Sequence, residues 1–148
     1  MRVYVPATLD EIPGPLTARP AHAVTRELRA ALPDEDDETV EFVAQLTAAD
    51  DALELLAAHP GAPRLRLVVS VDVPDAAVAP VADDGASPSA VRLVADVEVA
   101  DVACVHVDEP EARADVVAAL AGDADARERL EERDLLWYDA SELGEIPR

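Results

Sequence analysis

The stretch Val91–Leu120 constrains the fold most, because two apolar alternations are followed there by a helical pattern. Apolar residues alternate with charged ones over Val91–Val99, which is the period of a half-buried strand. A two-residue turn and a second apolar run, Val102–Val107, predict a hairpin. Asp108 follows as an expected helix N-cap, with Glu111 completing a capping box. The pattern predicts a mixed sheet with a helix lying on it.

Similar patterns predict the rest of the chain. Further strands are expected at Arg2–Pro6, Arg64–Val73 and Leu135–Tyr138, and helices at Ala21–Leu32, Glu38–His59 and Asp123–Asp134. This order favours the α+β class: a single domain over residues 1–148 whose mainly antiparallel sheet carries helices on one face. A ferredoxin-like sandwich is the best single expectation, with a flexible loop at about residues 74–90. A Rossmann-type sheet is disfavoured because strands and helices do not alternate regularly.

The longest predicted helix carries an apolar stripe with helical spacing. Phe42, Leu46, Ala49, Leu53 and Leu56 recur at intervals of three or four residues, so all five are expected to face the core.

Two other segments bear on function. Thr8–Pro20 is expected to be a loop with one helical turn near Leu9–Ile12, and it begins beyond a strand end, where binding residues are common. His22 is expected in the first turn of a helix, as a surface or capping residue.

The formal net charge of −20 limits the possible partners. It argues against binding to nucleic acid or to an anionic membrane, both of which require Lys and Arg to neutralise phosphate. It permits a basic protein partner or a cation, and mimicry of nucleic-acid charge is a further idea. The simplest interpretation is surface solvation, as in acidic proteomes. The lack of an apolar run or leader and the single Cys104 favour a cytoplasmic protein.

One group of side chains suggests metal chemistry. In the expected hairpin Val97–Glu109, the residues Asp96, Asp101, His106 and Asp108 are candidate ligands for Mn²⁺ or Mg²⁺. Each also has a local structural explanation, since Asp101 suits a turn and Asp108 a cap. No catalytic or cofactor-binding residue is assigned, and no cofactor is expected.

Two further groups of side chains suggest chemistry or binding. Cys104 and His106 share a strand face, as a nucleophile pair would, but the apolar flanks of Cys104 favour an inert buried thiol. Trp137 and Tyr138, with Tyr4, form either an aromatic patch for a partner or core packing, and core packing is the favoured alternative.

Four segments resemble an uncharacterised family of short acidic actinobacterial proteins. They are Arg2–Thr8, Ala21–Thr25, Val105–Glu109 and Leu135–Asp139, and the likeness spans essentially the whole chain. The resemblance implies a bacterial, cytoplasmic, single-domain protein and assigns no catalytic residues.

Two functional hypotheses follow. The first is a non-enzymatic interaction module that binds a protein, with a basic partner or a homodimer both open, through a sheet edge or an acidic face. The alternative is a metal-dependent enzyme that uses the Asp and His group of the hairpin.

Overall fold

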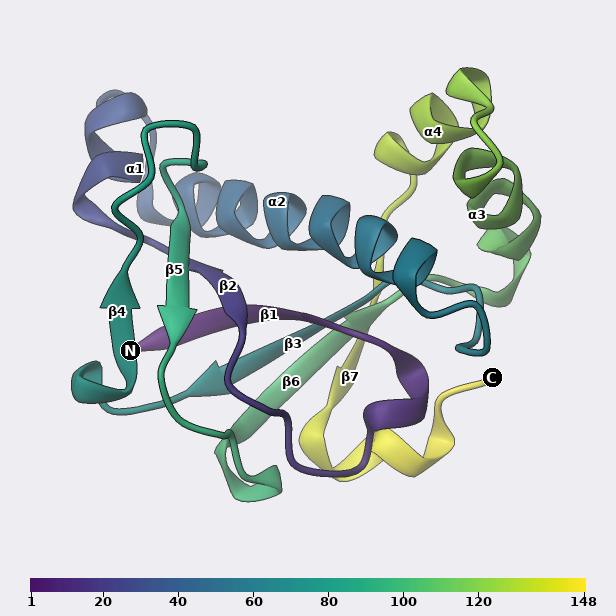
Figure 1. Cartoon of the computed structure of the whole chain (residues 1–148), viewed down its shortest axis with the longest axis horizontal. Helices are drawn as coiled ribbons and strands as arrows, with labels where there is room; N and C mark the ends of the chain where they lie inside the picture. Colours follow the sequence, from purple (N-terminus) through teal and green to yellow (C-terminus); the bar gives the residue numbers. More distant parts are fainter.

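The longest helix, α2 (Asp37–Ala58), crosses one face of a seven-stranded sheet in the computed structural model, which describes residues 1–148 (Figure 1). The strands, in their order across the sheet, are β4 (Val78–Pro80), β5 (Ala90–Leu93), β2 (Pro20–Ala23), β1 (Arg2–Ala7), β3 (Leu67–Asp72), β6 (Val102–Val107) and β7 (Leu136–Asp139). Every neighbouring pair is antiparallel. The expected α+β class is therefore confirmed.

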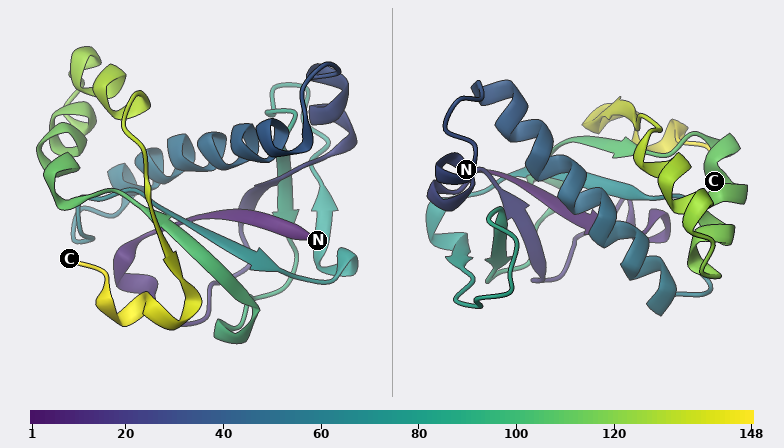
Figure 2. Two further views of the ribbon diagram at one scale, coloured as in Figure 1. Left: turned by 180° about the vertical axis from the view of Figure 1, so that it is seen from behind. Right: turned by 90° about the horizontal axis from the view of Figure 1, so that it is seen from above.

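The connections between strands place all four helices on one side of the sheet. β2 and β3 flank β1 and run parallel to each other, and the chain between them forms α1 (Arg26–Ala31) and α2. Between β6 and β7 the chain forms α3 (Arg113–Leu120) and α4 (Ala124–Glu131), which pack at the C-terminal end of α2 (Figure 2). The seven-strand order does not confirm a ferredoxin-like sandwich.

The largest part of the core lies on the sheet face opposite α2. Val3 and Val5 of β1 contribute to it, together with Leu67 and Val69 of β3. The short 3-10 turns η1 (Leu9–Glu11) and η5 (Ala140–Glu145), with adjoining loops, cover this face. Burial of each large aliphatic side chain contributes roughly 1.5–3 kcal/mol. The main core is covered by loops and 3-10 turns and not by the α-helices.

Helix α2 packs on the sheet through small side chains. Ala44 and Ala48 face Tyr4 and Val68 of the sheet and are fully buried. Alanine permits a close approach between helix and sheet, because it carries no side chain beyond Cβ.

The expected apolar stripe of α2 is therefore only partly correct. Ala49, Leu53 and Leu56 are buried as predicted, whereas Phe42 is 49% and Leu46 39% exposed. Phe42 and Leu46 lie on the same side of the helix as Leu53, and α3 and α4 cover this side at Leu53 but leave Leu46 at the border and Phe42 beyond it.

Two elements differ from the sequence prediction. The predicted helix Ala21–Leu32 begins as β2 and becomes helical only after Thr25, whose side chain caps α1. The predicted strand Val91–Val99 ends at Leu93, and Val97 makes only an isolated bridge to Leu16.

The predicted hairpin of Val91–Val99 with Val102–Val107 is also wrong. β5 pairs with β2 and β4, whereas β6 pairs with β3 and β7, so the two strands are not partners.

The segment expected as a flexible loop, about residues 74–90, contains β4 and a 3-10 turn, η2 (Asp75–Ala77). None of the helices combines the length and apolar character needed to cross a lipid bilayer.

Candidate functional site

The structure does not gather the four predicted metal ligands into one metal site. The Asp96 carboxylate accepts a hydrogen bond from the Ala18 amide at 2.9 Å, and Asp101 accepts one from the Glu98 amide at 3.1 Å. His106 lies on β6, and its Nδ1 has no hydrogen-bond partner. No group of three or more His, Cys, Asp or Glu side chains is arranged to hold a metal ion. The structure therefore gives the metal hypothesis no support.

Asp108 is a buried ion-pair partner and not the predicted helix N-cap. Its carboxylate accepts hydrogen bonds from Nε and Nη2 of Arg66 at 2.9 and 2.7 Å, and from the Arg66 amide at 2.8 Å. Arg66 also donates to the Leu130 carbonyl at 3.2 Å. The N-cap of the following 3-10 turn is Glu109, so the capping box expected from Asp108 and Glu111 is wrong. The Arg66–Asp108 pair joins the chain before β3 to the end of β6 and to α4.

No hydrogen bond joins Cys104 to His106, although both lie on β6. Cys104 is buried, as the sequence predicted. Burial lowers the pKa of His106, which favours the neutral imidazole. This arrangement does not activate a thiol, because thiolate formation requires a neighbouring positive charge or base.

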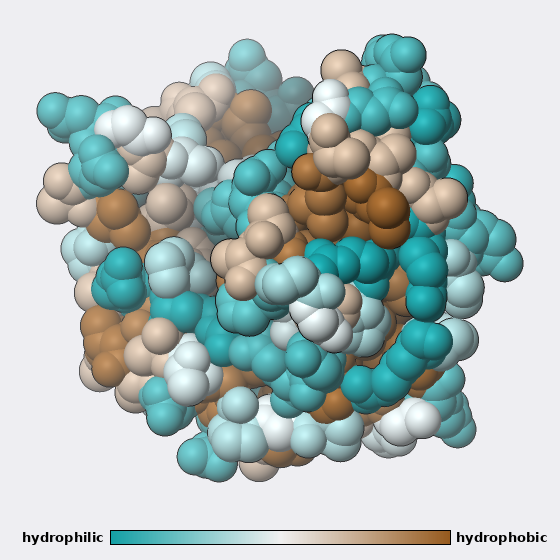
Figure 3. All heavy atoms as spheres, turned by 45° about the vertical axis from the view of Figure 1, so that its right-hand side comes forward, coloured by the Kyte–Doolittle hydropathy of each residue, from teal (hydrophilic) through white to brown (hydrophobic).

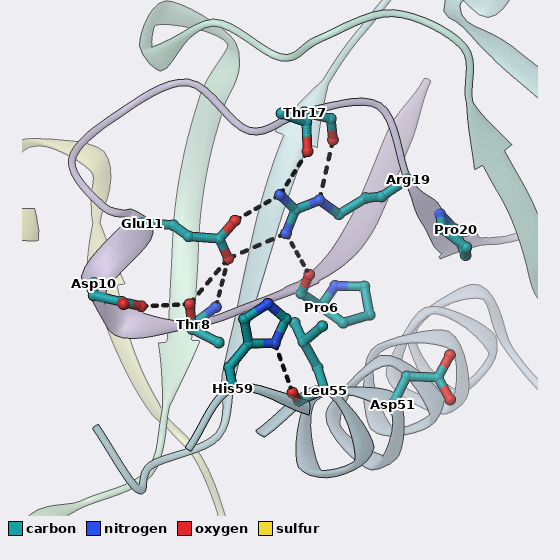
Figure 4. A pocket seen from close by; sticks show the side chains of 10 residues that line it. All are labelled: Pro6, Thr8, Asp10, Glu11, Thr17, Arg19, Pro20, Asp51, Leu55 and His59. Carbon is teal, nitrogen blue, oxygen red and sulfur yellow. Dashed lines mark hydrogen bonds and ion pairs between the residues drawn. The ribbon is translucent and has the colours of Figure 1, made fainter. Parts of the chain in front are cut away.

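A cavity of about 560 Å³ opens between the end of β1 and the C-terminal half of α2 (Figure 4). It is lined by Pro6, Thr8, Asp10, Glu11, Thr17, Arg19, Pro20, Asp51, Leu55 and His59. A concave site with converging polar groups is the usual setting for a small ligand.

One wall of the cavity is built around Arg19. Its Nη1 and Nη2 donate to the two carboxylate oxygens of Glu11 at 3.1 and 2.6 Å. Nε donates to the Thr17 carbonyl, Nη2 to the Thr17 hydroxyl and Nη1 to the Pro6 carbonyl. Hydrogen bonds from Arg19 and from the Thr8 amide outweigh burial and lower the pKa of Glu11, although desolvation is the largest single influence and acts to raise it. The Arg19–Glu11 pair is therefore held rigidly and is nearly neutral in itself.

The opposite wall is one face of α2. Asp51, Leu55 and His59 follow one another at intervals of four residues, so they align along the helix. His59 Nδ1 donates to the Leu55 carbonyl at 3.0 Å. In the neutral ring this leaves Nε2 as an acceptor.

His22 holds the Asp51 side chain from behind this wall. His22 Nε2 lies 2.7 Å from Asp51 Oδ2, and Nδ1 lies 2.8 Å from the hydroxyl of Ser89, which is 3.0 Å from that of Ser87. His22 is only 3% exposed, so the expectation of a surface or capping histidine in a helix is wrong. The sequence pattern predicted a helix where β2 lies, so it did not predict that the His22 ring is buried.

Ser89, His22 and Asp51 form a chain of the residue types found in serine hydrolases, but the geometry does not fit that chemistry. Ser89 is fully buried, so its hydroxyl cannot reach a substrate. His22 instead anchors the carboxylate of Asp51, a residue of the cavity lining.

The open edge of β7 is a second candidate surface. The Asp108 amide donates to the Arg66 carbonyl, so even-numbered residues of β6 bond to β3 and odd-numbered ones to β7. In the β6–β7 register, the backbone amides and carbonyls of Leu136 and Tyr138 then point toward β6. The backbone amide and carbonyl of Trp137 point away from the sheet. The Trp137 side chain is 58% exposed, so the favoured expectation of core packing is wrong for Trp137.

A shallower hollow of about 340 Å³ lies where α2 ends beside α3. Its apolar lining includes Leu56, Val117 and Leu120. Figure 3 brings this side of the molecule forward and shows apolar atoms gathered in its upper part, with hydrophilic atoms over most of the remainder. The hollow lacks converging polar groups, so the cavity beside Arg19 is the better-defined ligand site.

The sequence pattern indicated the loop after β1, Thr8–Pro20, as a plausible binding region but assigned no role to any single residue of the cavity. Nothing in the local sequence around Asp51 and His59 indicated a binding site, because polar residues on the surface of a helix are ordinary. Only the packing of α2 beside the loop brings the two walls together.

Comparisons with known proteins support the whole-chain resemblance. The chain matches no curated protein and no solved structure. The model of a family of unknown function (DUF6912) matches residues 1–146, and the chain therefore belongs to this family.

Proposed function

We propose that the protein is a non-enzymatic interaction module in which the β7 edge binds an extended basic segment of a partner protein. The observation that carries the proposal is the outward-facing amide and carbonyl of Trp137 on an open strand. An added strand makes main-chain hydrogen bonds at such an edge. The opposite edge is less suitable, because β4 ends in Pro80, which has no amide hydrogen.

Apolar side chains next to the edge support the same role. Trp137 shares a strand face with Leu135, which packs against the α2 cluster, and Leu135 and Leu46 line one small hollow. Phe42 lies one helical turn before Leu46 and is also exposed. A segment added to β7 would place alternate side chains on this face, where Trp137 provides a large apolar surface.

Charge favours a basic partner. The net charge is −20, Asp139 is the last residue of β7, and Asp134 lies shortly before the strand. Several arginines are already engaged in ion pairs within the chain, including Arg66, Arg129 and Arg133. A basic segment is therefore attracted over a long range, which raises association rates at low salt. The cytoplasmic location and actinobacterial origin inferred from the sequence form the setting of this proposal.

Site-specific photo-crosslinking in the host cell tests the proposal. A photoreactive phenylalanine at position 137 is expected to form an adduct with one basic protein, at a defined peptide. The same probe at Val94, which is also exposed, serves as the control and is expected to form no such adduct. Replacing Phe42 and Leu46 by Ser is expected to reduce the adduct at position 137 without unfolding the protein.

Three results would contradict the proposal. They are equal adducts from positions 137 and 94, no adduct from either, and an adduct insensitive to the Phe42 and Leu46 changes. An adduct of twice the chain mass would identify a second copy of this protein as the occupant, and so replace the basic partner with a homodimer.

A further inference from the structure

We propose that the cavity between β1 and α2 binds a small organic cation, with an ammonium or guanidinium group carried on a short aliphatic stem. This inference does not depend on the β7 proposal, because β7 contributes no residue to the cavity. The hydrogen-bond donors and acceptors that remain free on the cavity wall determine which ligand fits.

The donors of Arg19 are fully used. A guanidinium has five N–H groups, and here they serve the Glu11 carboxylate, the Thr17 carbonyl and hydroxyl, and the Pro6 carbonyl. Arg19 is therefore unable to bind an incoming phosphate or carboxylate without breaking its existing pairs.

Acceptors, in contrast, remain free on both walls. Asp51 uses Oδ2 to bind His22, which leaves Oδ1. Asp10 uses Oδ1 to accept from the Thr8 hydroxyl at 2.5 Å, which leaves Oδ2. His59 uses Nδ1 to donate to Leu55, which leaves Nε2. A ligand that donates several hydrogen bonds matches this set of acceptors.

Charge selects among such donors. Arg19 and Glu11 neutralise each other, so Asp10 and Asp51 give the lining a net negative charge. They lie at opposite ends of the cavity, with Leu55 and His59 between them (Figure 4). A charged hydrogen bond is roughly twice as strong as a neutral one. An organic cation is therefore favoured over a neutral polyol.

Shape and preorganisation favour a ligand with an aliphatic stem. Pro6, Pro20 and Leu55 provide apolar surface between the polar groups. Asp51 is fixed from behind by His22, whose ring is buried and anchored on Ser89. Fixing the carboxylate in advance reduces the entropy lost on binding. A hydrated metal ion would not use this apolar surface.

Calorimetric titration with 1,4-diaminobutane and agmatine tests the proposal, with succinate and 1,4-butanediol as anionic and neutral probes of similar length. Both cations are expected to bind with 1:1 stoichiometry and to shift the NMR signals of the His59 ring. Succinate and butanediol are expected not to bind. Asp10→Asn and Asp51→Asn are each expected to weaken binding by roughly tenfold, as expected when one charged hydrogen bond is lost.

Matched controls separate this site from general attraction to an acidic protein. Asp75→Asn removes one exposed carboxylate outside the cavity and is expected to leave the affinity unchanged. Mg²⁺ at equal ionic strength is expected not to displace the diamine. Asp51 also partners His22, so Asp10→Asn serves as the variant that leaves that pair intact. Equal binding to wild type and Asp10→Asn, or full competition by Mg²⁺, would overturn the proposal, as would the absence of cation binding.

Discussion

The ion pair between Arg66 and Asp108 is the residue-scale feature whose loss is expected to cost most. Both side chains are buried, and the Asp108 carboxylate also receives the Arg66 amide. Asp108→Ala would leave an uncompensated buried guanidinium. We expect the free energy of unfolding, measured by urea denaturation, to fall by about 3–5 kcal/mol.

The control for this prediction removes both charges. Replacing Arg66 by Met and Asp108 by Leu in one variant leaves no buried charge unpaired, so the loss is expected to be smaller than for Asp108→Ala alone. A double variant as unstable as the single one would show that the pair contributes through its own attraction and not through the penalty of an orphaned partner.

His106 gives the second residue-scale prediction, which concerns pH. Burial lowers the pKa of His106 below its ordinary value of 6.5 in the folded protein. Its contribution is thus fully present above pH 6.5 and is lost as pH falls through the folded pKa, because only the unfolded state gains a proton in that interval. His106→Leu is expected to flatten the decline in unfolding free energy as pH falls below about 6.5. An unchanged slope in urea denaturation below this pH would contradict the prediction.

At the scale of elements, α2 contains both core and border positions with the same residue types. Leu53 packs among α3 and α4, so Leu53→Ala is expected to lower the unfolding free energy by roughly 2–5 kcal/mol. Leu46 lies at the border and is partly exposed to solvent in the folded protein. Leu46→Ala is therefore expected to lower the unfolding free energy less than Leu53→Ala. Chemical denaturation of the two variants checks the comparison, and equal losses would refute the division of α2.

The same elements show what local sequence could predict. β1 and α2 carry strong period-two and helical patterns, and both were found where predicted. β2 was missed because Val24, Leu28 and Leu32 have helical spacing, while pairing with β1 and β5 determines the conformation of Pro20–Ala23.

Functional residues were hard to predict for a related reason. Asp108 has the local features of a cap, but the distant Arg66 decides its role. The cavity likewise joins the loop after β1 to Asp51 and His59, and no spacing within the chain reports that contact. Local alternation also extended β5 to Val99, although its partner β2 is only four residues long.

At the scale of the whole molecule, the net charge of −20 sets opposite responses of stability and binding to salt. Like charges repel most strongly in the compact state, and the Debye length falls from about 30 Å at 0.01 M to about 10 Å at 0.1 M. We therefore expect the melting temperature to rise as NaCl increases from about 0.01 to 0.1 M, measured by circular dichroism. Binding of a basic partner at β7 is expected to weaken over the same range, because screening reduces attraction between opposite charges. The loss of acidic charge from the exposed run before α2, by Asp34→Asn and Glu35→Gln, should reduce the salt-dependent rise. A melting temperature that falls with salt would instead show that the arginine ion pairs outweigh the net repulsion.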